Sequence, residues 1–172
     1  MRRTAIVVCF SALVALPANA QWESGREGDT CGISMEYEGE GATKLMIVGD
    51  GETDPIIHIT NYNWTAKKDE KYTIQYHMGG YYYEIPSIGV EFTGARKGFA
   101  TYISDKFVDD FARSPSIQLQ VGDKLIDDLK LDGSGAAIAK FRACIRVRKA
   151  EIAKLKADDE RLKHIPKDPF AE

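Results

Sequence analysis

The chain has 172 residues, with 23 basic and 26 acidic side chains that give a formal net charge of −3. This mildly acidic balance argues against a nucleic-acid partner, because nucleic-acid-binding domains present a basic face. Beyond the N-terminus, no apolar stretch approaches the roughly 20 residues of a membrane span. The length suits one domain with a genuine hydrophobic core.

The N-terminus predicts a secretory signal peptide over residues 1–20. Two arginines precede the apolar run 5–16, and the small-residue pattern A-N-A follows at residues 18–20. The alternative is an N-terminal anchor, for which the apolar run is short. Cleavage would remove two basic and no acidic residues, which leaves 21 basic and 26 acidic residues and a net charge of −5. We expect a mature chain that begins at Gln21 and is periplasmic or secreted.

Two cysteines remain after the predicted cleavage, Cys31 and Cys144. In an oxidising compartment, two cysteines most simply form one disulfide. This bond would tie the first strand of the domain to the last helix, and a loop of that length is worth about 4–5 kcal/mol in the chain-entropy model. The alternative is a pair of free thiols in a metal or redox site, but the sequence has no C-x-x-C pair.

The first half of the mature chain reads as strands and turns. Residues 21–30 are polar and glycine-rich, and they are predicted to form a flexible leader. From Cys31 onward, short segments rich in Ile, Thr, Tyr and Phe alternate with turns. This texture predicts a mainly β fold, either a β-sandwich or a strongly curved antiparallel sheet. The seven predicted strands are CGISMEYE, TKLMIVG, IIHITNYNW, KYTIQYHM, YYYEI, IGVEFTG and GFATYI.

A short helix and a hairpin are predicted next. Ser104 can cap a helix near residues 105–113, in which Phe107 and Phe111 share one face. The segment SIQLQV-GDK-LIDDLKL then predicts a β-hairpin with Gly122 and Asp123 near the turn.

A long helix closes the domain. It is predicted to begin near Ser134 and to carry apolar side chains at helical spacing as far as Ile145. We therefore assign residues 31–147 to a β-rich domain with a C-terminal helix, and residues 148–172 to a charged helical extension and tail. The mixed charges of the extension indicate a solvated helix, and the alternative is a thin apolar stripe that contacts a partner helix.

Three features of this pattern resemble a known class of proteins. They are the single cysteine that opens the first predicted strand, the N-x-N-W element at residues 61–64, and the segment L-x-L-x-G-S-x-A-A-I-A-x-x-x-x-C at residues 129–144. Over residues 31–145 the spacing resembles small exported proteobacterial proteins similar to the invasion-associated locus B family of β-sandwich proteins. The resemblance implies a periplasmic sandwich with a C-terminal helix pinned by a disulfide, and it implies no catalytic residue, cofactor or substrate.

Two histidines are the candidate metal ligands. By the strand period of two, His58 and His77 lie on the side opposite the apolar residues of their strands. If these strands pair around the segment AKKDE, the two side chains face each other at about 4.5–5.5 Å between Cβ atoms, close enough to share a metal ion. The sequence marks no third ligand, so two surface histidines, with no metal and no cofactor, are the main interpretation.

Aromatic side chains form the candidate binding surface. At least one of Tyr81, Tyr82 and Tyr83 must face away from the core, because neighbouring strand residues point to opposite sides. With Tyr62 and Trp64 they predict an aromatic patch for a protein or glycan partner. The alternative is that these residues simply fill a sheet, for which aromatic side chains have high propensity.

The sequence contains no G-x-S-x-G, H-E-x-x-H or phosphate-binding loop motif. We therefore expect a non-catalytic exported protein that binds another envelope macromolecule, for example as an inhibitor or accessory factor. The alternative is an enzyme, either a hydrolase of envelope polymers or a metal-dependent enzyme that uses His58 and His77.

Overall fold

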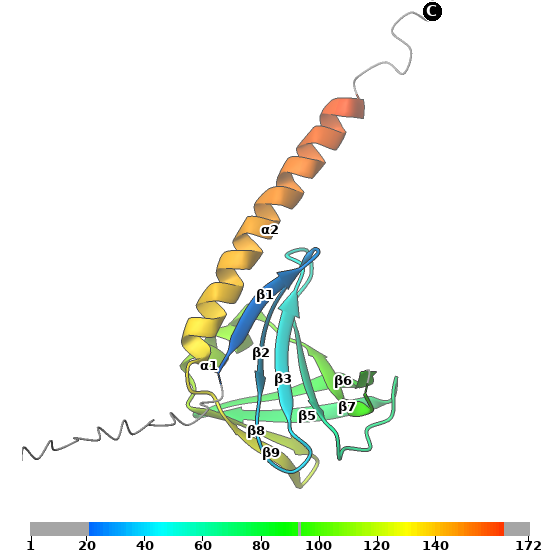
Figure 1. Cartoon of the computed structure of the whole chain (residues 1–172), viewed down its shortest axis with the longest axis vertical. Helices are drawn as coiled ribbons and strands as arrows, with labels where there is room; N and C mark the ends of the chain where they lie inside the picture. The colour runs from blue at the N-terminus through cyan, green and yellow to red at the C-terminus, as the bar shows by residue number, and fades with distance from the viewer. Residues whose placement is uncertain (1–20, 93, 164–172) are drawn as a thin grey trace, which may run out of the picture.

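The structure is a computed structural model that describes residues 21–92 and 94–163, and it is mainly β with a long C-terminal helix (Figure 1). The predicted signal peptide at residues 1–20 and the tail at residues 164–172 lie outside the described residues. The elements in chain order are β1 (Glu23–Glu27), β2 (Thr30–Glu36), β3 (Lys44–Gly49), β4 (Ile56–Asn61), β5 (Lys71–Met78), β6 (Tyr81–Phe92), β7 (Arg96–Tyr102), α1 (Asp105–Arg113), β8 (Ser116–Val121), β9 (Lys124–Lys130) and α2 (Ser134–Lys163).

The described strands form one open antiparallel sheet in the order β1-β2-β3-β4-β7-β6-β5-β8-β9. The sheet curls until its two ends meet through side chains: the Tyr37 hydroxyl donates to the Lys130 carbonyl at 2.8 Å, and Thr43 donates to Asp127 at 2.6 Å. These contacts join the β2–β3 end to β9 without a backbone ladder between the edge strands β1 and β9. Of the two predicted architectures, a curved antiparallel sheet is present and a β-sandwich is not confirmed.

Residues 21–30 are not the flexible leader that the sequence predicts. Residues 23–27 form β1, which pairs with β2 from Glu23 opposite Ser34 to Glu27 opposite Thr30. All five residues of β1 are exposed, so backbone pairing rather than apolar burial fixes this strand, and periodicity could not reveal it. Just before β1, the Trp22 indole donates to the Asp132 carbonyl at 3.0 Å.

Two predicted strands, YYYEI and IGVEFTG, are a single strand, β6. Pro86 lies inside it and pairs with Thr73 of β5, whereas pairing between β6 and β7 begins only at Ile88. Proline has no N–H to donate, so it is tolerated where one side of the strand is unpaired.

The core lies on the inner side of the curl. Ile57 and Ile59 of β4, and Ile74, Tyr76 and Met78 of β5, are each at most 2% exposed, which confirms the predicted inward faces of these strands. Burial of each such side chain contributes about 1.5–3 kcal/mol relative to exposure.

Helix α1 covers part of this core and follows the predicted signals. The Ser104 hydroxyl accepts a hydrogen bond from the Phe107 amide at 3.3 Å, and so caps the helix. Phe107, Val108 and Phe111 are buried against the sheet, and the edge of the Tyr76 ring meets Phe107 with 5.3 Å between centroids.

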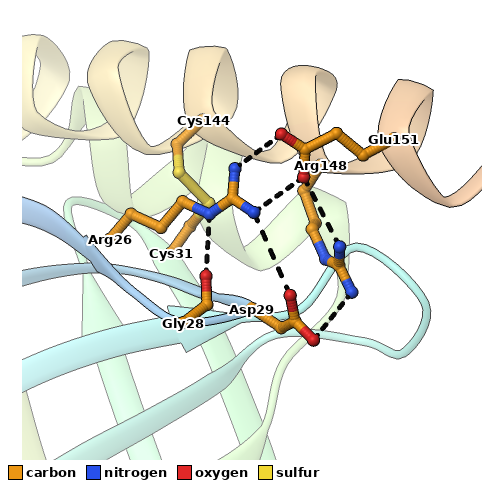
Figure 2. Close-up of a disulfide and its surroundings, with 7 residues drawn as sticks. All are labelled: Arg26, Gly28, Asp29, Cys31, Cys144, Arg148 and Glu151. Carbon is orange, nitrogen blue, oxygen red and sulfur yellow. Dashed lines mark hydrogen bonds and ion pairs between the residues drawn. A yellow bond between two sulfur atoms is a disulfide. The ribbon is translucent and has the colours of Figure 1, made fainter.

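The predicted Cys31–Cys144 disulfide is present and fastens α2 to β2. Figure 2 shows the ion pairs beside it, where Arg26 donates to both carboxylate oxygens of Glu151 at 2.9 and 2.7 Å, and Arg148 lies 3.1 Å from Asp29. Beyond these contacts, α2 extends past the sheet as far as Lys163 (Figure 1). Neither helix in the described residues is long and apolar enough to cross a membrane.

Candidate protein-binding face

The outward side of the central strands β3, β4, β7 and β6 is unusually apolar. Met46 pairs with His58, His58 with Ala100, and Ala100 with Ile88, so these four residues form one row across the four strands. Ile88 is 47% exposed, although it lies in the middle of the sheet. We call this surface the outer face, and its apolar members are Met46, Val48, Ile56, Tyr62, Ile88, Val90, Phe92 and Tyr102.

The apolar side chains are concentrated on the central strands, although β9 also carries Leu125, which pairs with Gln120 and is 58% exposed. On the same side of the sheet, β2 carries Ser34 and Glu36, and β8 carries Gln118 and Gln120. An antiparallel sheet that faces water normally alternates apolar-in with polar-out, as β2 does. An exposed group of apolar side chains with a polar rim is typical of a protein interaction site.

This face was missed in the sequence, although a signal for it is present. The run Leu45–Val48 is continuously apolar, whereas a strand with one solvated side alternates. Strands that are covered on both sides read as continuous apolar runs. Since Leu45 and Ile47 fill the core, the apolar side chains of Met46 and Val48 on the other side are the part of this run that a strand with one solvated side would not show.

At one edge of the outer face lies a small cavity of about 250 Å³. Gly98 of β7 pairs with Thr60 in its floor, and a side chain at Gly98 would collide with the carbonyl oxygen of Ile59. The backbones of β4 and β7 therefore approach each other closely beneath this cavity. We call it the Arg96–His58 cavity, and its lining residues are Glu36, Lys44, Met46, His58, Thr60, Tyr62, Phe92 and Arg96.

Arg96 is the most deeply buried cation of this cavity, with 8% of its side chain exposed. Its Nη2 atom donates to Glu36 Oε1 at 2.6 Å, and its guanidinium carbon lies 4.2 Å from the centroid of the Tyr62 ring. Its Nη1 atom is buried and has no hydrogen-bond partner among residues 21–92 and 94–163. A buried guanidinium N–H without a partner carries an unfavourable desolvation cost, which an acceptor that reached this atom would relieve.

His58 lies in the same cavity, and the edge of its ring meets Phe92 at 5.5 Å between centroids. Its Nδ1 atom is also buried and finds no hydrogen-bond partner in the part of the chain that the structure describes. Burial lowers the pKa of His58 below its usual value of 6.5, because desolvation disfavours the charged imidazolium.

The predicted facing of His58 and His77 is wrong. Strand β4 pairs with β3 and β7, whereas β5 pairs with β6 and β8, so the two histidines are not cross-strand neighbours. His77 instead lies opposite Tyr82, with 4.9 Å between ring centroids. Within residues 21–92 and 94–163, no group of three or more His, Cys, Asp or Glu side chains is arranged to hold a metal ion.

The five predicted aromatic residues do not form one patch. Tyr62 follows the end of β4, next to the Phe92 end of β6, whereas Tyr82 lies at the other end of that strand, up to about 30 Å away. Trp64 packs against the core residue Phe99 with 5.6 Å between centroids. Tyr81 and Tyr82 are exposed, and only Tyr62 belongs to the outer face.

Tyr83 points inward and belongs to a charged cluster with α1. Its hydroxyl donates to Asp110, which also accepts from Lys106 and Arg113 at 2.6 Å each. Hydrogen bonds from Lys106, Tyr83 and Arg113 lower the pKa of Asp110 to about 2. A carboxylate held ionised by three donors is suited to joining α1 to β6 and ill suited to proton transfer near neutral pH.

A larger cavity of about 800 Å³ lies at the seam where the ends of the sheet meet. Trp64 and Tyr37 line it, together with several acidic side chains. Its polar groups bond to one another, since Asn61 donates to Thr43 at 2.9 Å and Thr43 donates to Asp127. These bonds hold the curl of the sheet together.

Comparison with known proteins gives no match, whether to a family model, to a curated protein or to a solved structure. The resemblance to the invasion-associated locus B family therefore stays a prediction.

Proposed function

We propose that this protein is exported to the periplasm or secreted, and that it binds another protein of the cell envelope through the outer face without catalysing a reaction. The observation that carries this proposal is the set of half-exposed apolar side chains on β3, β4, β7 and β6. A partner that covers them gains roughly 25 cal/mol for each Å² of apolar surface removed from water. Such a protein suits the role of an inhibitor or accessory factor.

Export is supported by two independent features. The first is the predicted signal peptide at residues 1–20, with its basic start, apolar run and A-x-A pattern. The second is the Cys31–Cys144 disulfide, because structural disulfides persist in oxidising compartments and are rare in the cytosol. We expect the exported form to begin at Gln21 and to contain no free thiol.

The composition of the outer face favours a protein partner over a glycan. Interface cores are enriched in aromatic residues, Met and Arg and are depleted of charged residues such as Lys and Glu. The outer face offers Met46, Phe92 and Tyr102, with Arg96 beside Phe92 at one edge. Its aliphatic members, such as Ile88, have no polar group with which to recognise a sugar hydroxyl.

The metal-dependent alternative needs His58 and His77 in one site, and the strand order separates them. We therefore do not propose it. The hydrolase alternative stays an untested prediction. None of the clusters described above contains a nucleophile with an adjacent base, so none of them supports it.

Site-specific photo-cross-linking in intact cells tests the proposal. A cross-linking amino acid is placed at Ile88 or Tyr102 of the outer face, and at Leu125 or Leu155 as controls. All four residues are exposed apolar side chains, and the controls lie on β9 and on the extended part of α2. We expect one dominant protein to be captured from the two outer-face positions and not from the control positions.

Binding of the purified partner then completes the test. The double variant Ile88→Thr/Tyr102→Thr is expected to weaken binding at least tenfold, whereas Leu125→Thr leaves the affinity unchanged. Capture from Leu155 alone would show that the interface lies on α2, and capture of polysaccharide would show that the partner is a glycan. Either result would overturn the proposal. Export is checked separately by the intact mass of the periplasmic protein, which should correspond to residues 21–172 with two hydrogens fewer.

A further inference from the structure

We propose that the Arg96–His58 cavity binds a carboxylate group of the partner protein, either an acidic side chain or the C-terminus. This inference rests on the proposed function, since it assigns a specific anchor to the outer face. It depends on the two unpartnered nitrogen atoms of the cavity, on its charge and on the shape of its walls.

The two nitrogen atoms match the acceptors of a carboxylate. Among the described residues, Arg96 Nη1 carries N–H groups with no acceptor and His58 Nδ1 is equally unpartnered; both atoms are buried, and both residues line the cavity. A carboxylate has two oxygen atoms that accept hydrogen bonds, so it can take one from Arg96 and one from the imidazole of His58. Such charge-assisted bonds are about twice as strong as bonds between neutral groups.

The charges that line the cavity favour a monoanion. Arg96 and Lys44 are cationic and Glu36 is anionic, so the lining carries a net charge of +1 with neutral His58. This local excess contrasts with the acidic balance of the whole chain. A single carboxylate neutralises it, whereas a phosphate dianion would leave an uncompensated negative charge in a partly dry site.

Two aromatic rings form part of the cavity wall, and one of them, Tyr62, is half-exposed. Phe92 stands against His58, and Tyr62 lies over the guanidinium of Arg96. Tyr62 is 50% exposed and directly follows the end of β4, so its ring can rotate without disturbing the core, and the proposal requires that this rotation opens a path to Nη1. A carboxylate that enters in this way is flanked by aromatic rings, which exclude water and strengthen its bond to Arg96.

The cavity is tested first with sodium benzoate, an aromatic carboxylate, against benzamide, its neutral analogue of similar shape. The protein is the oxidised chain of residues 21–172, and NMR follows the His58 ring and the Arg96 side chain. We expect saturable shifts of both groups with benzoate and at least tenfold weaker binding of benzamide. Equal binding of both compounds, or shifts that map away from His58 and Arg96, would overturn the proposal.

Variants separate a direct contact from a general effect of charge. Arg96→Met is expected to weaken benzoate binding at least tenfold, and Arg96→Lys to weaken it to a lesser degree, because lysine lacks the fork of guanidinium donors. The control is Arg161→Met on the extended part of α2, where the side chain is 69% exposed. It removes the same charge far from the cavity. Equal losses of benzoate affinity in Arg161→Met and Arg96→Met would therefore contradict direct binding of benzoate by Arg96.

Competition with the partner identifies the source of the carboxylate. If the partner inserts its own carboxylate, benzoate competes with it, and Arg96→Met weakens partner binding. If benzoate binds without competing, the site takes a small carboxylate instead, and the proposal for the partner is wrong while the protein-binding outer face stands. If no partner is captured from Ile88 while benzoate still binds at Arg96, the proposed function fails and the cavity remains a carboxylate site.

Discussion

The two sides of strands β3, β4 and β7 have similar apolar side chains but different surroundings. Inward residues such as Ile47 and Ile57 are fully buried, whereas their outward neighbours Met46 and Ile56 are only partly buried, and Tyr102 is 61% exposed. The difference teaches that apolar sequence alone does not define the core of this domain. A side chain becomes core when a second layer covers it, and under the proposed function that layer on the outer face comes from another molecule.

Removal of the disulfide is expected to have the largest effect on stability, because it fastens the helix that covers the inner side. The double variant Cys31→Ala/Cys144→Ala frees residues that are 113 positions apart. In the chain-entropy model, we expect the free energy of unfolding to fall by about 4 kcal/mol. Urea unfolding followed by circular dichroism measures this change, and a loss below about 1 kcal/mol would contradict a structural role for the bond.

A pair of neighbouring substitutions compares the two sides directly. Ile47 is 0% exposed in the core, so Ile47→Ala removes buried methyl groups and leaves a cavity. We expect a loss of about 3 kcal/mol, within the usual range for such changes. Met46→Ala, one residue away on the outer face, is expected to cost less than about 1 kcal/mol. Equal losses in urea unfolding would show that the outer side is already packed within the monomer.

Asp110, whose hydrogen bonds join α1 to β6, predicts a loss of stability that occurs only at acidic pH. The pKa of Asp110 is lowered to about 2, chiefly by its hydrogen bond with Lys106 and then by those with Tyr83 and Arg113. A carboxyl group whose pKa falls on folding stabilises the protein above its unfolded value near 3.8, and this contribution is lost as the pH falls toward 2. Between about pH 5 and 2, the melting temperature of Asp110→Asn should therefore fall less with decreasing pH than that of the unsubstituted chain.

The outer face makes a weaker pH prediction of the same sign. Because burial lowers the pKa of His58, the folded state favours the neutral imidazole. The unfolded chain binds the proton more readily, so stability falls as the pH drops below the unfolded value of 6.5. His58→Phe should remove this component from unfolding curves between about pH 7 and 5. His77→Phe is the matched control, and an equal change in that variant would contradict the assignment to His58.

Local features of the fold could be predicted, whereas its long-range order could not. The inward positions of Ile59 and Tyr76 follow from the strand period, and Ser104 marks the start of α1 through its side chain. The placement of β4 beside β7 depends on contacts between segments far apart in the chain, which periodicity does not encode. For this reason the predicted facing of His58 and His77 failed.

The candidate site was harder to predict than the fold, for a related reason. Tyr62 was identified from its residue type, but its neighbours Phe92 and Arg96 come from a different pair of strands. Their meeting depends on the same strand order. Exposure of Ile88 could not be predicted either, because the sequence does not state which side of a strand another element covers.

The smallest expected effect on stability belongs to the substitutions with the largest expected effect on binding. Ile88→Thr and Tyr102→Thr keep residues suited to a strand, and the replaced side chains are 47% and 61% exposed. We expect the free energy of unfolding to change by no more than about 0.5 kcal/mol for each, as is usual for exposed positions. The isolated double variant should also be more soluble, since it loses apolar surface. If these substitutions destabilise the monomer as strongly as Ile47→Ala does, the outer face is part of the core of the monomer, and its apolar side chains need no partner to explain them.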